Sequence, residues 1–66
     1  MQVIINGERH MSTATMTLAQ AVALLTSAPT GVAAALNGDV VRRAAWDSTS
    51  LADGDEVEVL TAVQGG

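Results

Sequence analysis

Two Asn-Gly dipeptides, Asn6-Gly7 and Asn37-Gly38, constrain the fold of this chain more than any other feature of its sequence. A two-residue type I′ turn needs positive φ at both central positions, and Asn-Gly is among the pairs that tolerate it best. β-Branched residues precede the first dipeptide at 3–5 and follow the second at 40–41, as is typical of strands. The sequence therefore predicts two hairpins, with strands at 3–5 and about 8–12, and at 32–37 and 40–41. The alanine-rich run at 32–36 also suits a short helix, but the turn after it favours a strand.

One helix is predicted between the hairpins, from Thr17 to about Ser27. Thr17 and Gln20 match the capping box, in which each side chain satisfies a backbone amide at the helix start. Apolar residues recur with helical spacing and form one stripe, made of Leu18, Ala21, Val22 and Leu25, with Leu24 widening it. Pro29 and Gly31 are expected to stop the helix, because neither residue continues it readily.

The rest of the chain supplies one more strand and a loop. Residues 42–51 are expected to be irregular, with Trp46 covering one end of the core because it is the single aromatic residue. Asp53-Gly54-Asp55 predicts a turn, and the alternation at 56–59 predicts a half-buried strand that continues to residue 63. The expected fold is α+β: one β-grasp, or ubiquitin-like, domain over 1–66, with one main helix on a mixed sheet of four to five strands.

Composition excludes several classes of function. The chain has 66 residues, no Cys and one His, which argues against disulfides, zinc–thiolate sites and a metal centre. It has no Lys, one aromatic residue and a net charge of −4, so binding to nucleic acid is not expected. Neither a signal peptide nor a membrane span is recognisable, and a cytoplasmic location is expected. No motif assembles a nucleophile with an acid and a base, so we expect no catalytic residue and no enzyme activity.

The chain ends in Gln64, Gly65 and Gly66. Residues without a Cβ atom make the thinnest possible peptide and adopt many backbone conformations. A flexible tail of this kind can thread a narrow channel and present the α-carboxylate of Gly66 to the active site of a partner. A frayed end without function is the alternative interpretation of the same residues.

The alternation in the last strand also predicts a docking surface beside this tail. If Val57 and Val59 face the helix, then Glu56, Glu58 and Leu60 lie on the opposite face of the sheet. An exposed leucine beside carboxylates is a candidate docking patch, which predicts a basic partner and an association that salt weakens. The alternative is that Leu60 merely covers a sheet edge.

Several segments together resemble the thiamin-biosynthesis sulfur carrier family, usually called ThiS. The matching segments are the opening strand with Asn6-Gly7, "LNGDVV" at 36–41, Arg43, Trp46, "LADGDEVEVLTAV" at 51–63, and Gly65-Gly66. The resemblance implies that a ThiF-type enzyme adenylates the Gly66 carboxylate with ATP. A sulfur donor protein would then convert it to a thiocarboxylate that supplies sulfur to the thiazole synthase. This chain would bind no cofactor stably, and it would be a carrier and co-substrate of its partners.

Three other functions remain open from the sequence. The small subunit of molybdopterin synthase, or another thiocarboxylate sulfur carrier, shares the fold and the chemistry that the resemblance implies. A ubiquitin-like modifier would join its terminus to lysines of other proteins. A β-grasp binding module with an incidental tail is the third alternative.

Overall fold

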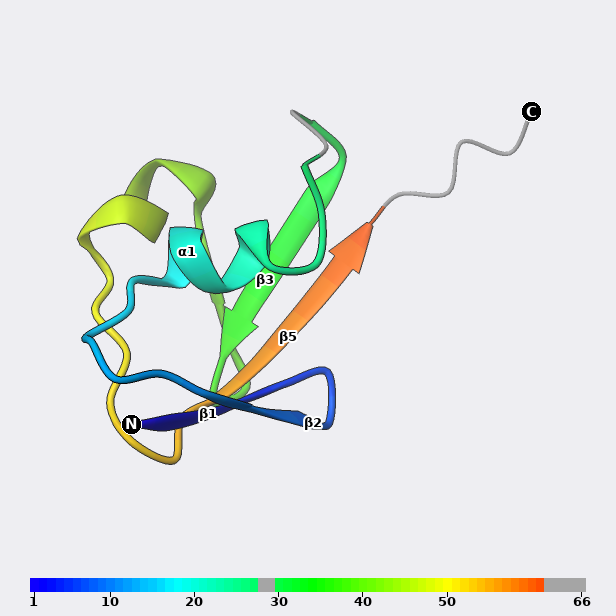
Figure 1. The fold of residues 1–66 in the computed structure, drawn as a ribbon. Coiled ribbons are helices and arrows are strands. Elements are labelled where there is room, and N and C mark those ends of the chain that lie inside the picture. Colours follow the sequence, from blue (N-terminus) through cyan, green and yellow to red (C-terminus); the bar gives the residue numbers. More distant parts are fainter. Residues whose placement is uncertain (28–29, 62–66) are drawn as a thin grey trace.

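The computed structural model describes residues 1–27 and 30–61, which form a five-stranded mixed sheet with α1 packed on one face (Figure 1). The elements in chain order are β1 (Gln2–Ile5), β2 (Glu8–Met11), α1 (Leu18–Ala23), β3 (Val32–Leu36), β4 (Asp39–Val41), the 3₁₀ helix η1 (Arg43–Ser48) and β5 (Glu56–Thr61). The strand order is β2-β1-β5-β3-β4. β1 and β5 are parallel, whereas the other neighbouring strands are antiparallel. The α+β sheet with one main helix is the predicted one.

Both Asn-Gly dipeptides form the predicted tight turns. Asn6 and Gly7 have φ of 51° and 83°, and Asn37 and Gly38 have φ of 50° and 88°. Such values at both central positions define a type I′ turn, whose twist matches that of the flanking strands. The first turn joins β1 to β2, and the second joins β3 to β4, so the strand predicted for the alanine-rich run is confirmed.

The last strand, β5, occupies the centre of the sheet. On one side it pairs with β3 over five residue pairs, from Leu36 opposite Val57 to Val32 opposite Thr61. On the other side it pairs with β1 only at Ile4 and Ile5. The predicted extension of this strand to residue 63 lies outside the described residues.

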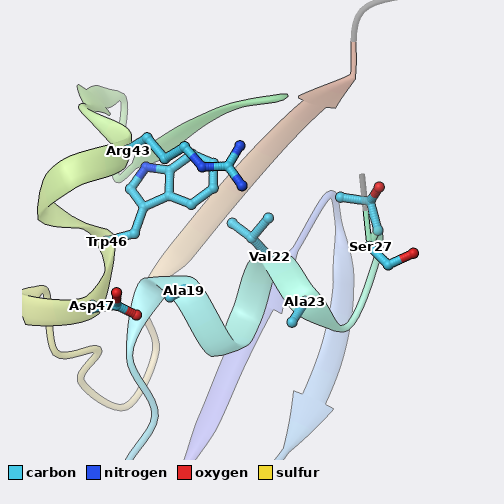
Figure 2. Close-up of a pocket in the computed structure, with 8 residues that line it drawn as sticks. Ala19, Val22, Ala23, Ser27, Arg43, Trp46 and Asp47 are labelled. Atoms are coloured by element: carbon cyan, nitrogen blue, oxygen red, sulfur yellow. The ribbon is translucent and has the colours of Figure 1, made fainter. Parts of the chain in front are cut away.

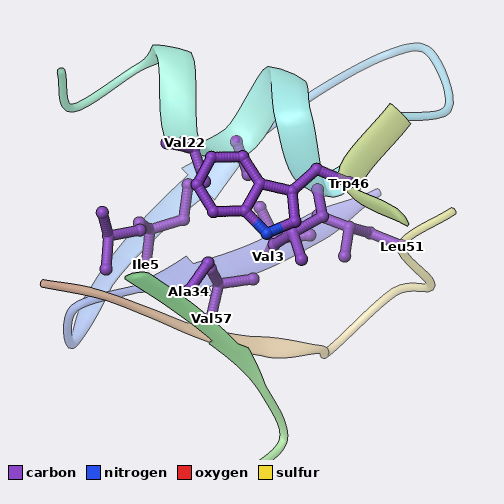
Figure 3. Close-up of a cluster of buried hydrophobic side chains, with 10 residues drawn as sticks. Val3, Ile5, Val22, Ala34, Trp46, Leu51 and Val57 are labelled. Atoms are coloured by element: carbon purple, nitrogen blue, oxygen red, sulfur yellow. The ribbon is translucent and has the colours of Figure 1, made fainter. Parts of the chain in front are cut away.

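The core lies between the sheet and α1, and it is closed by a single tryptophan (Figure 3). Its buried side chains are Val3, Ile5, Leu18, Ala21, Val22, Ala34, Trp46, Leu51, Val57 and Val59. The Trp46 Nε1–H donates a hydrogen bond of 2.8 Å to the carbonyl oxygen of Val41. The polar edge of the indole is thus satisfied where its rings are buried, which agrees with the predicted covering role.

The helix begins where predicted but ends too early for the predicted stripe. It runs over Leu18–Ala23, whereas the sequence predicted a helix to about Ser27. The amides of Leu24 and Leu25 donate to carbonyls three residues back, at Ala21 and Val22. The Thr26 amide donates to the same Val22 carbonyl, four residues back, so the helix ends in a turn that mixes three- and four-residue hydrogen bonds. Leu24 and Leu25 are both exposed there. Leu25 therefore does not belong to the buried stripe, and the predicted stop at Pro29 lies outside the described residues.

The capping box at the helix start forms as predicted. The Thr17 Oγ1 accepts from the Gln20 amide at 3.2 Å, and the Gln20 Oε1 accepts from the Thr17 amide at 2.8 Å. We expect Thr17→Ala to lower the free energy of unfolding by about 1 kcal/mol, because one amide of the first turn loses its acceptor. Urea unfolding followed by circular dichroism measures this. Thr15→Ala, at an exposed position in the preceding loop, serves as the control, and an equal loss there would contradict the assignment.

The segment predicted to be irregular contains the 3₁₀ helix η1, so that prediction is wrong for Arg43–Ser48. The Ala45 amide donates to the carbonyl of Arg42, and the Thr49 amide donates to that of Trp46. The Thr49 hydroxyl adds a hydrogen bond of 2.6 Å to the carbonyl of Ala45. Short 3₁₀ segments carry no apolar stripe of period 3.6, and the sequence therefore lacks a signal for this element.

Candidate functional site

The exposed face of β5 carries the side chains that the sequence singled out for docking. Val57 and Val59 are buried towards α1, whereas Glu56, Glu58 and Leu60 are exposed. Because successive side chains of a strand point to opposite faces, these three lie on the sheet face away from α1. This placement is the one that the alternation predicts, and their part in docking stays a prediction.

The register of the sheet gathers further apolar side chains around Leu60. Ala33 of β3 lies opposite Leu60, Ala35 lies opposite Glu58, and Val40 of β4 lies opposite Ala35. Paired residues of neighbouring strands share a face, so all four apolar side chains lie on the open face. We call Ala33, Ala35, Val40 and Leu60 the open-face patch. Val40 and Leu60 are its large members, and both are strongly exposed.

A shallow hollow adjoins the open-face patch where β3 begins and β5 ends. It has a volume of about 420 Å³ and is lined by Gly31, Val32, Ala33, Leu60 and Thr61. Leu60 therefore borders this hollow as well as the open face of the sheet. An apolar side chain of a partner could seat there, beside the strand that leads to the C-terminal residues.

Two carboxylates border the patch without a cationic neighbour. Glu56 and Glu58 are exposed, and within residues 1–27 and 30–61 the one ion-pair contact joins His10 to Glu8 at 4.0 Å. Arg9 of β2 shares this face with Glu56, but Ile4 of β1 lies between the two. The two glutamates thus offer their charge to the solvent or to a basic partner.

The predicted functional residues at the chain end, Gln64, Gly65 and Gly66, lie outside the described residues. The structure describes the strand that leads to them as far as Thr61. β5 is the central strand, hydrogen-bonded on both sides at its start, so the body of the domain holds this strand firmly. The open-face patch and the chain end are therefore carried by one strand.

A second hollow lies on the opposite side of the sheet, between α1 and η1 (Figure 2). It measures about 270 Å³, and its lining residues are Ala19, Val22, Ala23, Thr26, Ser27, Arg43, Trp46 and Asp47. The Arg43 Cζ lies 5.2 Å from the centroid of the Trp46 ring, within the range of a cation–π contact. Sequence reasoning did not predict this hollow, because it depends on η1. No His, Lys or Cys lines it, and we assign Arg43 and Trp46 a packing role there.

The described residues contain no obvious centre for other chemistry. Within residues 1–27 and 30–61, no group of three or more His, Cys, Asp or Glu side chains is placed to hold a metal ion. No helix in that part of the chain is long and apolar enough to cross a membrane.

The sheet order, the parallel β1–β5 pair and the single helix define a β-grasp protein. The family model described as the ThiS family matches residues 3–66. The chain therefore belongs to the ThiS family, and the predicted resemblance is confirmed. No curated protein matches the chain significantly.

Two solved structures are similar to the whole chain. One is the crystal structure of a thiamine biosynthesis protein (ThiS) from Geobacter metallireducens, which is 32% identical with a TM-score of 0.77, the match covering 100% of both chains. The other is the solution structure of a thiamine biosynthesis protein from Geobacter metallireducens, also 32% identical, with a TM-score of 0.80. It covers 100% of this chain and 88% of that one. These similarities confirm the predicted β-grasp fold.

Proposed function

We propose that this chain is a sulfur carrier protein of thiamine biosynthesis, whose Gly66 carboxylate carries the sulfur as a thiocarboxylate. The observation that carries the proposal is the ThiS family match, which reaches the terminal Gly65-Gly66. The two similar solved structures, both of thiamine biosynthesis proteins, support it. The central strand β5 supports it as well, because it links the folded domain to the reacting end.

The proposed chemistry needs activation because a carboxylate is a poor electrophile. A ThiF-type enzyme joins the Gly66 carboxylate oxygen to the α-phosphorus of ATP and releases pyrophosphate. The terminal sulfur of a persulfide on a donor protein then attacks the acyl carbon and displaces AMP. A thiol cleaves the resulting S–S bond and is itself oxidised to a disulfide, which leaves the thiocarboxylate on Gly66. The thiazole synthase receives this sulfur.

In this scheme the carrier supplies the reacting chain end and a docking surface, and the partner enzymes supply the catalytic groups. Gly65 and Gln64 thread the channel that leads to the active site of the activating enzyme, since glycine occupies little width. The chain needs no stably bound cofactor of its own, because ATP is used by the adenylating partner. The proposal places the protein in the cytoplasm with its partners, without nucleic acid or membrane as a ligand.

The open-face patch is the proposed docking site for the partner enzymes. Leu60 and the neighbouring apolar side chains dock a partner, while Glu56 and Glu58 favour one with a basic surface. The exposure of Leu60 and its place on the strand that precedes the tail support this role. A partner that grips this patch holds the carrier a few residues from Gly66.

The intact mass of the chain tests the proposed function. The full chain is co-expressed with the adenylating enzyme and the sulfur donor of its own organism, beside a version that lacks Gly66. We expect a mass gain equal to the replacement of one oxygen by sulfur in the full chain and none in the shortened one. An unchanged mass with both partners active and ATP present would refute the proposal and favour a ubiquitin-like modifier or a binding module. Co-purification with a thiazole synthase separates the thiamine pathway from that of molybdopterin synthase.

A further inference from the structure

β5 is longer than its pairing with the neighbouring strand β1. β1 pairs with β5 only as far as Ile5 opposite Val57, whereas β5 runs on to Thr61. Figure 1 shows β5 passing the β1–β2 hairpin on its way to its last residues. Within the described residues, the part of β5 after Val57 therefore pairs with a strand on one side only, where β3 continues to Thr61.

Beyond the end of β1, the side chain of Asn6 forms hydrogen bonds with β5 instead. Its Oδ1 accepts a hydrogen bond of 2.7 Å from the Val59 amide, and its Nδ2 donates one of 3.1 Å to the Val59 carbonyl oxygen. The main-chain amide of Asn6 also donates to the carbonyl of Val57 at 2.9 Å. The Asn6 side chain thus satisfies both the amide and the carbonyl of Val59, the two backbone groups that a longer β1 would otherwise pair.

Among residues 1–27 and 30–61, this contact is the nearest one to the chain end on that edge of β5. The backbone groups of Asp55, Val57 and Val59 face β1 and the Asn6 side chain. By alternation, those of Thr61 are the next to face the same side. Asn6 therefore holds the strand two residues before the last residue that the structure describes.

We infer that Asn6 is a positioning residue for the reaction at Gly66, an inference that rests on the proposed function. By holding Val59 from the side opposite to β3, it fixes the direction in which β5 leaves the domain. Without this hold the open-face patch still docks, but the chain end samples more directions relative to the docked body. Placement of a reacting group contributes directly to the rate of the chemical step, so the loss falls on kcat.

Asn37 provides a matched comparison within the same chain. It also begins an Asn-Gly turn, with φ of 50° against 51° for Asn6. Its Oδ1 accepts from the Glu56 amide at 2.9 Å, and its Nδ2 donates to the Asp55 carboxylate at 3.1 Å. It therefore binds β5 in a similar way, but from the β3 side and at the opposite end of the strand.

The test compares Asn6→Gly with Asn37→Gly in the full chain, since glycine keeps the positive φ of both turns. With the adenylating enzyme and ATP, we expect Asn6→Gly to lower kcat about tenfold and to change KM less than about twofold, as for the loss of one or two hydrogen bonds. Asn37→Gly is expected to leave both constants unchanged. Asn6→Asp, which keeps an acceptor for the Val59 amide, is expected to recover part of kcat.

Amide hydrogen exchange in the free variants gives a readout that needs no partner. In Asn6→Gly the amides of Val59 and Leu60 should exchange faster than in the parent chain, and in Asn37→Gly they should not. Equal losses of kcat in both glycine variants, or a loss confined to KM, would overturn the inference, as would unaltered exchange at Leu60. A parent chain that is never adenylated by its active partner would overturn the proposed function and the reaction role of Asn6 together. In that case the exchange rates of the free variants still show whether Asn6 holds β5, so a failure of the proposed function is distinguishable from a failure of the inference itself.

Discussion

Leu60→Asp is expected to leave the chain folded and to abolish thiocarboxylate formation at Gly66. Leu60 is 69% exposed on the face away from α1, so its replacement removes little from the core. In a docked complex the partner's apolar side chains cover this position, so a carboxylate there is buried without a cation in direct contact. Leaving a charge unpaired at an interface costs several kcal/mol, which lowers affinity by at least about a hundredfold.

A change of the same kind elsewhere on the sheet is the control. Met11 is 75% exposed and pairs with Gln2, on the same open face but in the edge strand β2. Met11→Asp therefore introduces an equal charge that is separated from Leu60 by β1 and lies towards the opposite end of the sheet. Intact mass measures sulfur loading, and circular dichroism verifies the fold. Normal loading of a folded Leu60→Asp chain, or equal loss in Met11→Asp, would argue against docking through Leu60.

Trp46→Ala is expected to lower the free energy of unfolding by about 3–5 kcal/mol, the usual loss when a large aromatic side chain is removed from a core. Trp46 is 6% exposed and packs from η1 towards α1. The stability of a whole domain is only about 0.05–0.15 kcal/mol per residue. The loss therefore approaches the entire stability of a 66-residue chain, and we expect much of the variant to be unfolded at 37 °C.

Trp46→Phe keeps the prediction measurable if the alanine variant does not fold. Phenylalanine retains an aromatic ring but leaves the carbonyl oxygen of Val41 without its 2.8 Å donor. We expect a smaller loss than for alanine, of about 1–3 kcal/mol. Urea unfolding must be followed by circular dichroism, because Trp46 is the only tryptophan. Losses below about 1 kcal/mol in both variants would show that Trp46 is not an essential part of the core.

The sequence predicted those parts of the fold that depend on neighbouring residues. The two Asn-Gly turns, the Thr17–Gln20 capping box and the alternation of β5 each involve residues within a few positions of one another. The exposed position of Leu60 follows from the same alternation, so the candidate docking face was predictable too. The helix end was not, because Leu25 continues the apolar spacing and Leu24 widens it although the α-helix ends at Ala23.

Other features were decided by the tertiary structure, because they join segments that are distant in the chain. The sequence determined the turns, the helix start, the face of each β5 side chain and the Gly65-Gly66 end. The parallel pairing of β1 with β5, and the clamp of Asn6 on Val59 across 53 positions, exist only once the sheet has formed. The 3₁₀ helix around Trp46 also depends on assembly, since a short segment of this kind gains its stability from packing on α1. Local preferences therefore define the elements, and the burial of a shared core decides their order in the sheet.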